Sequence, residues 1–187
     1  MNKFKTIALS LVALVSFTAN AQTKVIDAQK SNIHWVGKKV TGQHEGTISF
    51  KDGALIFKDK KLAGGKFTVD MTTINTTDLK GGMKDKLDGH LKSEDFFGTE
   101  KFPTAGLVFK TIATKDKNNY TVTADLTIKG ITNTVTFDIN INGKVATTKL
   151  IVNRAKYDIK YGSGSFFENL GDKTIYDDFE LDVTLNF

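Results

Sequence analysis

The chain has 187 residues, enough for one domain with a substantial hydrophobic core, and it lacks the cysteine needed for disulfide bridges or a cysteine nucleophile. The formal net charge of +5 includes Lys3 and Lys5 of an N-terminal export signal, without which 24 basic residues face 21 acidic residues, a difference of +3. Because the lysines are spread among acidic residues, we expect no nucleic-acid partner, which would need a clustered basic face.

The first 21 residues have the pattern of a cleavable secretory signal. Two lysines give a positive start, an apolar run covers residues 7–17, and Ala19-Asn20-Ala21 is a small-x-small cleavage site. We therefore expect residues 1–21 to be removed and residues 22–187 to be exported and to fold as one domain. The apolar run is shorter than the roughly 20 residues that a spanning helix needs, and no later run approaches that length, so no stable membrane insertion is expected.

Alternating apolar and polar residues dominate the rest of the chain. Residues 120–128, 135–141 and 179–187 keep a period of two, which predicts antiparallel strands with one buried and one solvent-facing side. Asp52-Gly53 and Asn142-Gly143 are hairpin signals, and Lys129-Gly130 divides two further strands. We expect eight or nine short strands and no linker, a series that closes most naturally into a barrel or a two-sheet sandwich.

The period changes once, near residues 79–91. Apolar residues there recur every four positions with lysines between them, and they predict a short amphipathic helix: Leu79, Met83, Leu87 and Leu91. Asp78 is a candidate N-cap for this helix. An aromatic tail follows and ends at the only proline of the chain: Phe96, Phe97, Phe102 and Pro103. One helix with such a tail, set among strands, suggests a plug or lid on a sheet.

Twelve apolar positions are expected to face the interior of a barrel. They are Trp35, Phe50, Phe57, Phe67, Met71, Leu107, Phe109, Leu126, Ile128, Val135, Phe137 and Phe179. A barrel of about eight strands is either filled by its side chains or holds one small apolar ligand. Periodicity alone leaves both possibilities open, because both give the same inward pattern.

Four sequence blocks resemble the YceI-like family of polyisoprenoid-binding periplasmic proteins, over nearly the whole mature chain. The first is SNIHW at 31–35, followed by two glycines. The second and most specific is DGHLKSEDFF at 88–97, which ends in KFPTA at 101–105. The third is ADLTIKGIT at 124–132, and the fourth is NRAKYDI at 153–159.

The resemblance implies a mainly β fold, an extended antiparallel lipocalin-like β-barrel of about eight strands with one short helix packed at its side. It implies a periplasmic binding protein rather than an enzyme. The twelve apolar positions would line a pore for a polyisoprenoid or similar long-chain amphiphile, such as an isoprenoid quinone, held for storage or transport. No other cofactor is expected, since the lipid or quinone is the ligand.

Polar residues leave a second hypothesis, a histidine-based enzyme, with or without a metal ion, that uses the same pocket. His34 and His44 flank Lys39 symmetrically, so a hairpin could bring them opposite each other, but the spacing predicts no metal site. His90 is expected to hydrogen-bond to the strand beneath it, near Asp95. Arg154 would either fix the last strands by an ion pair or meet a polar head group at the pore mouth. A homodimer through edge strands, or a filled barrel that acts through its surface, also stays open.

Overall fold

The computed structural model describes residues 21–187, so the expected signal peptide lies almost wholly outside the described residues. The described part contains one α-helix, α1 (Gly81–Lys92), and two 3₁₀ turns, η1 (Arg154–Tyr157) and η2 (Gly171–Lys173). Its strands are β1 (Ala21–Val25), β2 (Asn32–Lys39), β3 (Gly42–Lys58), β4 (Lys61–Thr76), β5 (Thr104–Thr114), β6 (Asn119–Ile128), β7 (Ile131–Asn142), β8 (Val145–Asn153) and β9 (Ile175–Asn186).

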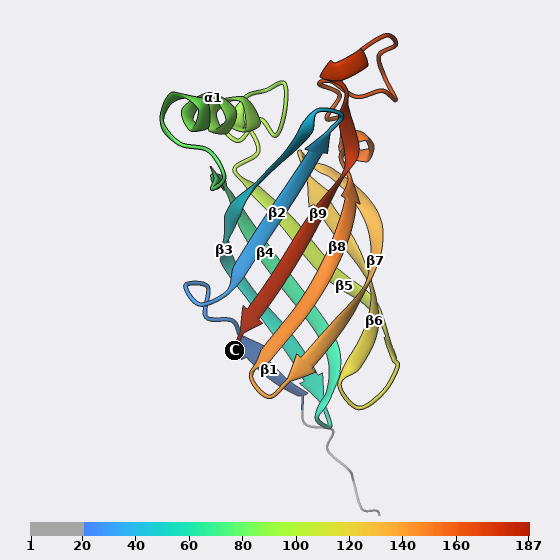
Figure 1. Cartoon of the computed structure of the whole chain (residues 1–187). Coiled ribbons are helices and arrows are strands. Elements are labelled where there is room, and N and C mark those ends of the chain that lie inside the picture. The colour runs from blue at the N-terminus through green and yellow to red at the C-terminus, as the bar shows by residue number, and fades with distance from the viewer. Residues whose placement is uncertain (1–20) are drawn as a thin grey trace, which may run out of the picture.

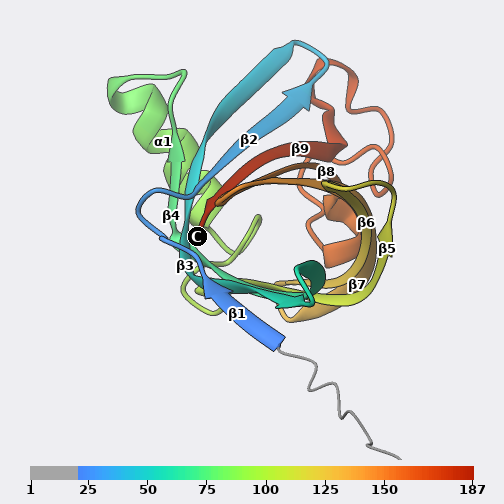
Figure 2. The same ribbon diagram turned by 90° about the horizontal axis from the view of Figure 1, so that it is seen from below.

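The strands form one antiparallel barrel (Figure 1). Their order is β1-β3-β2-β9-β8-β7-β6-β5-β4, and the additional pairing of β3 with β4 closes the ring. β1 is the extra strand, because it pairs only with residues 54–58 of β3. Figure 2 shows the ring from below, with β1 outside it and α1 to one side. The expected fold, an extended barrel of about eight strands with one short helix at its side, is confirmed.

Two of the three expected turns are confirmed. Gly130 (φ 75°) and Gly143 (φ 62°) supply the left-handed backbone between β6 and β7 and between β7 and β8. The hairpin expected at Asp52-Gly53 is wrong, because β3 runs through it with only a register shift. A side chain at Gly53 would lie 2.4 Å from the Phe67 ring, so this glycine permits packing rather than a turn.

The helix begins two residues later than expected, and Asp78 does not cap it. Lys80 is the N-cap residue and makes no side-chain capping bond. Asp78 instead accepts hydrogen bonds from His44 Nδ1 at 2.8 Å and from the Glu45 amide at 3.3 Å. Asp88 of α1 accepts from the Thr76 amide at 2.8 Å. These two carboxylates therefore attach the helical segment to the ends of β3 and β4.

Both carboxylates are held in their charged forms. Partial burial acts to raise the pKa of Asp78, but the hydrogen bonds from His44 and the Glu45 amide outweigh it and hold that pKa below its ordinary value. Burial likewise acts to raise the pKa of Asp88, and hydrogen bonds from Lys84 and Thr76 lower it overall. The attachment of α1 therefore depends on ionised carboxylates.

Candidate apolar binding site

The barrel interior contains two apolar cavities. Cavity 1, of ≈ 140 Å³, lies toward the end that carries α1 and is lined from β2, β3, β4, β5, β6, β9, α1, η1 and the segment after α1. Its lining residues are Ile33, Trp35, Gly37, Ile48, Val69, Met71, Ile74, Leu91, Phe96, Phe97, Ala105, Leu126, Ile128, Arg154, Ile175, Tyr176, Phe179 and Leu181. Arg154 is the one charged side chain in this set.

Cavity 2, of ≈ 80 Å³, lies farther along the barrel. It is lined by Ile33, Phe50, Phe67, Val69, Leu107, Phe109, Leu126, Phe137, Ile139, Thr148, Leu150, Leu181, Val183 and Leu185. Phenylalanine rings form a row on its wall: centroids lie 6.1 Å apart for Phe50 and Phe67, 5.7 Å for Phe67 and Phe109, and 5.9 Å for Phe109 and Phe137. Such tilted pairs stabilise each other beyond the burial of their area, so the wall of cavity 2 is firmly packed.

Four side chains line both cavities: Ile33, Val69, Leu126 and Leu181. They form a waist between the two cavities, and the cavities succeed each other along the barrel axis. An engineered protein cavity of about 150 Å³ holds a molecule the size of benzene. Cavity 1 therefore accommodates one small apolar molecule as it stands, whereas cavity 2 has little more than half that volume. A longer chain would have to pass the waist.

Ten of the twelve positions expected to face the interior line one or both cavities. Phe57 and Val135 do not. Phe57 packs against Phe187 with ring centroids 5.8 Å apart, and Val135 is a partly buried residue beside the core. The list of expected positions omitted Ile33, Val69 and Leu181, although Val69 and Leu181 share the period-two pattern of residues that it included.

Arg154 is almost completely buried, with 2% of its side chain exposed. Its Nε donates to the Tyr176 carbonyl, Nη1 to the Ile159 and Tyr161 carbonyls, and Nη2 to the Ile175 carbonyl, at 2.9 to 3.2 Å. Nη2 also lies 3.4 Å from the carboxylate of Asp177. Four of the five N–H groups of the guanidinium therefore donate to main-chain carbonyls, and Asp177 lies beside the second N–H group of Nη2 as an ionic partner without a hydrogen bond in the described part of the chain.

Burial lowers the pKa of Arg154 from its ordinary value, and the charge of Asp177 partly offsets this effect. Of the two roles expected for Arg154, the contacts fit the structural one. It joins the loop after η1 to the start of β9, where Ile175 and Tyr176 line cavity 1.

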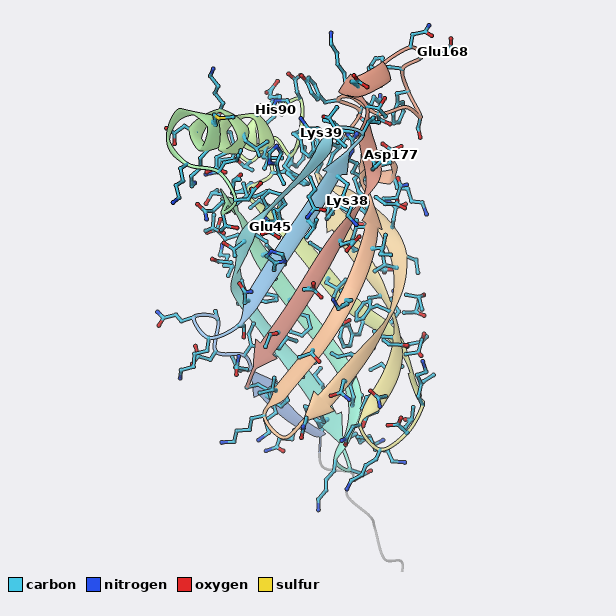
Figure 3. The ribbon with its side chains drawn as sticks, in the orientation of Figure 1. Lys38, Lys39, Glu45, His90, Glu168 and Asp177 are labelled. Carbon is cyan, nitrogen blue, oxygen red and sulfur yellow. The ribbon has the colours of Figure 1, made fainter. Side chains whose placement is uncertain are left out.

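His90 and Asp95 do not form a polar pair. The His90 ring packs against Tyr161 and Phe96, with centroids 4.3 Å and 5.6 Å away. Its Nε2 atom is buried and has no hydrogen-bond partner within residues 21–187, so the expected bond to a strand is wrong. Asp95 is exposed. Figure 3 shows His90 and Asp177 at the end of the barrel that carries α1.

The other two histidines do not converge. In the β2–β3 ladder His34 lies opposite Thr47, and Gly37 lies opposite His44. Each histidine meets its own carboxylate, His34 with Glu45 at 3.3 Å and His44 with Asp78 at 2.8 Å. Across the described residues, no group of three or more side chains is placed to hold a metal ion. The alternative of a histidine-based enzyme is therefore not favoured. No helix within residues 21–187 has both the length and the apolar character needed to cross a membrane.

The closed eight-stranded antiparallel barrel and its apolar interior cavities place the fold of this chain in the lipocalin-like class. Residues 25–187 match the profile of the YceI-like domain. The chain belongs to the YceI-like family.

Solved structures of other proteins share the fold. BcnA of Burkholderia cenocepacia is 26% identical, with a TM-score of 0.68 over 86% of this chain and 98% of BcnA. A domain from Saccharophagus degradans, described as polyisoprenoid binding, is 15% identical, with a TM-score of 0.58 over 90% of this chain and 97% of that domain. The second likeness establishes the fold alone.

Curated relatives match over a shorter length. Protein YceI of Escherichia coli is 36% identical over 99 residues, which are 53% of this chain and 49% of that protein. A UPF0312 protein of Staphylococcus aureus is 40% identical over 105 residues, 50% of this chain and 55% of that protein. The chain thus spans about half the length of the curated relatives that it matches.

Proposed function

We propose that this protein is an exported, periplasmic carrier that holds the hydrocarbon chain of a polyisoprenoid or similar long-chain amphiphile, isoprenoid quinones included, for storage or transport. The observation that carries the proposal is the pair of successive cavities with an apolar lining, in which the one charged side chain, Arg154, is engaged by four main-chain carbonyls. The domain of S. degradans described as polyisoprenoid binding supports this choice of ligand.

The driving force is the burial of hydrocarbon. Each methylene removed from water contributes about 0.8 kcal/mol, so ten carbons contribute about 8 kcal/mol before the cost of ordering the chain, on the scale of a micromolar complex. A polar head buried without a hydrogen bond would cost roughly 2–7 kcal/mol. The head group therefore stays at the surface while the chain occupies the cavities.

The small size of the two cavities means that the barrel must rearrange to hold a long chain. Typical ligand pockets measure about 300–1,000 Å³, more than either cavity offers. A long chain must therefore displace the side chains of the waist. Leu126 on β6 and Leu181 on β9 each line both cavities. Because leucine is unbranched at Cβ, these side chains can change rotamer and make room for the chain.

Mass spectrometry of an organic extract of the purified mature protein tests the proposal. We expect one polyprenyl lipid or quinone in stoichiometric amount, and lower occupancy in Leu126→Trp and Phe137→Trp, which fill the waist and cavity 2. Val108→Trp is the matched control, because Val108 is a surface residue that is 42% exposed. An empty extract, together with failure to load the protein with isoprenoids, would refute the carrier function.

A further inference from the structure

The barrel wall is incomplete between β7 and β8 (Figure 1). Main-chain pairing joins only residues 139–142 of β7 to residues 145–148 of β8, the shortest ladder within residues 21–187. Beyond the Ile139–Thr148 pair, β7 continues for eight residues that pair with β6 alone, and β8 for five that pair with β9 alone. At the fork, the Thr148 hydroxyl donates to the Asp138 carbonyl at 2.6 Å. Two strand edges therefore separate in the middle of the wall.

A cleft of ≈ 380 Å³ occupies this gap on the outer surface. It is lined by Asn133, Thr134, Val135, Thr136, Leu150, Ile151, Asn153, Lys156, Tyr157 and Asp178. We call it the β7–β8 cleft. Leu150 lines both this cleft and cavity 2, so one layer of side chains separates the outside from the interior at this point.

Tyr157 of η1 packs into the gap and lines the β7–β8 cleft. It is 1% exposed, and its hydroxyl is buried without a hydrogen-bond partner in the described part of the chain. A buried hydroxyl without a partner costs about 1–3 kcal/mol, so the position of Tyr157 in the gap carries an unsatisfied polar group. The η1 turn is attached to β7 by a bond from Asn133 Nδ2 to the Lys156 carbonyl at 2.9 Å.

The end of the barrel that carries α1 is closed more firmly. Leu91, Phe96 and Phe97 cover it, each with 8% exposure. The Phe96 and Phe97 rings pack edge to face at 5.1 Å, and Asp88 fixes α1 to the Thr76 amide. Opening this end would separate aromatic contacts and ionic hydrogen bonds, whereas opening the β7–β8 cleft would break no main-chain ladder.

We infer that the β7–β8 cleft is the side portal through which a hydrocarbon chain reaches cavity 2, with Leu150 and Tyr157 as its movable wall. This inference rests on the proposed carrier function. The chain slides between two strand edges that are already separated, Leu150 changes rotamer, and the end of the chain passes first into cavity 2 and then through the waist into cavity 1. The polar head remains in the cleft, among Asn133, Asn153 and Lys156.

The absence of cysteine allows a clean test by single-site blocking. Ile151 lies in the cleft and is 69% exposed, and Ile151→Cys carries a polyethylene-glycol maleimide there without disturbing the core. Val108→Cys with the same label is the matched control on β5. Tyr176→Cys, at the edge of cavity 1 and 51% exposed, blocks the rival route near α1.

The probe is retinol, an isoprenoid alcohol that accepts excitation energy from tryptophan. Trp35 is the only tryptophan of the chain and lines cavity 1, so stopped-flow energy transfer from Trp35 reports arrival of the probe. We expect the label at Ile151 to slow association by about tenfold or more, and the label at Val108 to leave it within about twofold.

Equal association rates for the Ile151 and Val108 conjugates would overturn the portal, as would slowing by the Tyr176 label alone. Either result would leave the proposed carrier function standing, because the probe would still bind. Absence of saturable energy transfer in the unlabelled protein would instead overturn the carrier function and the portal together.

Discussion

Arg154 should be among the most costly residues to replace, although we assign it no contact with a ligand. It is the only arginine of the chain, and its guanidinium serves four carbonyl groups, those of Ile159, Tyr161, Ile175 and Tyr176. Arg154→Met keeps much of the apolar stem and removes all of these donors at once. The planar fork of arginine explains the choice, since a lysine ammonium has three donors from a single atom.

The expected loss of stability in Arg154→Met follows from the number of hydrogen bonds that the substitution removes. Each hydrogen bond contributes about 1 kcal/mol net, so the loss of four costs about 4 kcal/mol. Removal of the positive charge also leaves the carboxylate of Asp177, whose side chain is 14% exposed, without its ionic partner. The hydrogen bond from the Ser165 hydroxyl to Asp177 at 2.5 Å limits that second penalty. We therefore expect the free energy of unfolding to fall by about 4–5 kcal/mol.

Urea unfolding followed by Trp35 fluorescence and circular dichroism measures this change. The expected loss corresponds to a fall in Tm of about 8–20 °C for a chain of this size. Lys38→Met is the matched control: Lys38 pairs with Glu180 at 2.5 Å, but the two side chains are 43% and 50% exposed, so its loss costs less than about 1 kcal/mol.

Arg154→Lys is a second variant that tests the same contacts if Arg154→Met does not fold. It keeps the charge and some donors, so its free energy of unfolding should lie between those of Arg154→Met and the unsubstituted protein. If Arg154→Met cost no more than Lys38→Met, the carbonyl network would not be what holds the loop and β9 together.

Two further predictions concern α1 and the barrel wall. Asp78 and Asp88 have lowered folded-state pKa values, so their contribution to stability is fully present above their ordinary pKa of about 4 and is lost as the pH falls through the lower folded values. Hydrogen exchange of residues 81–92, corrected for its intrinsic pH dependence, should show less protection at about pH 3 than at pH 5, and unchanged protection would contradict the anchoring role. Gly46→Ala should lower the free energy of unfolding, measured by calorimetry, by about 1–3 kcal/mol, because the added methyl would lie 2.0 Å from a carbonyl oxygen of β4. In Gly37→Ala the added methyl meets nothing within 4 Å, so the free energy of unfolding should change by less than about 1 kcal/mol. Equal costs at the two glycines would show that the contact at Gly46 relaxes.

The alternating pattern predicts the strands and their buried sides, but it leaves a barrel and a two-sheet sandwich open, and only the resemblance to the YceI-like family implies the barrel. Burial of the apolar face of each strand places Phe50, Phe67 and Phe137 on the inner side, and all three line cavity 2. The same pattern says nothing about how far along the barrel a residue lies. Phe57 faces inward by parity yet lies against Phe187, away from both cavities.

Turn signals were less reliable where glycine has another purpose. Gly53 leaves room for the Phe67 ring, so Asp52-Gly53 imitates a hairpin within a continuous strand. The actual turn after β3 uses Asp59 and Lys60 at φ 50° and 66°, without the glycine that usually marks such a turn in a sequence. The separation of β7 from β8 is also invisible, because Val135 and Phe137 keep their alternation while the strand loses its partner.

The arrangement of polar groups bears on which ligands a carrier of this kind would select. Arg154 donates to four main-chain carbonyls, and the remaining cavity lining offers hydrocarbon, so the interior of the barrel favours no particular polar head. An apolar pocket discriminates a single methylene by only about 1–3 kcal/mol. On the proposed function, selection inside the barrel therefore depends on the cross-section and length of the chain at the waist of Ile33, Val69, Leu126 and Leu181. Chains of equal thickness with different heads should compete for the same protein, and branched isoprenoid chains should depend more on substitutions at Leu126 than straight chains do.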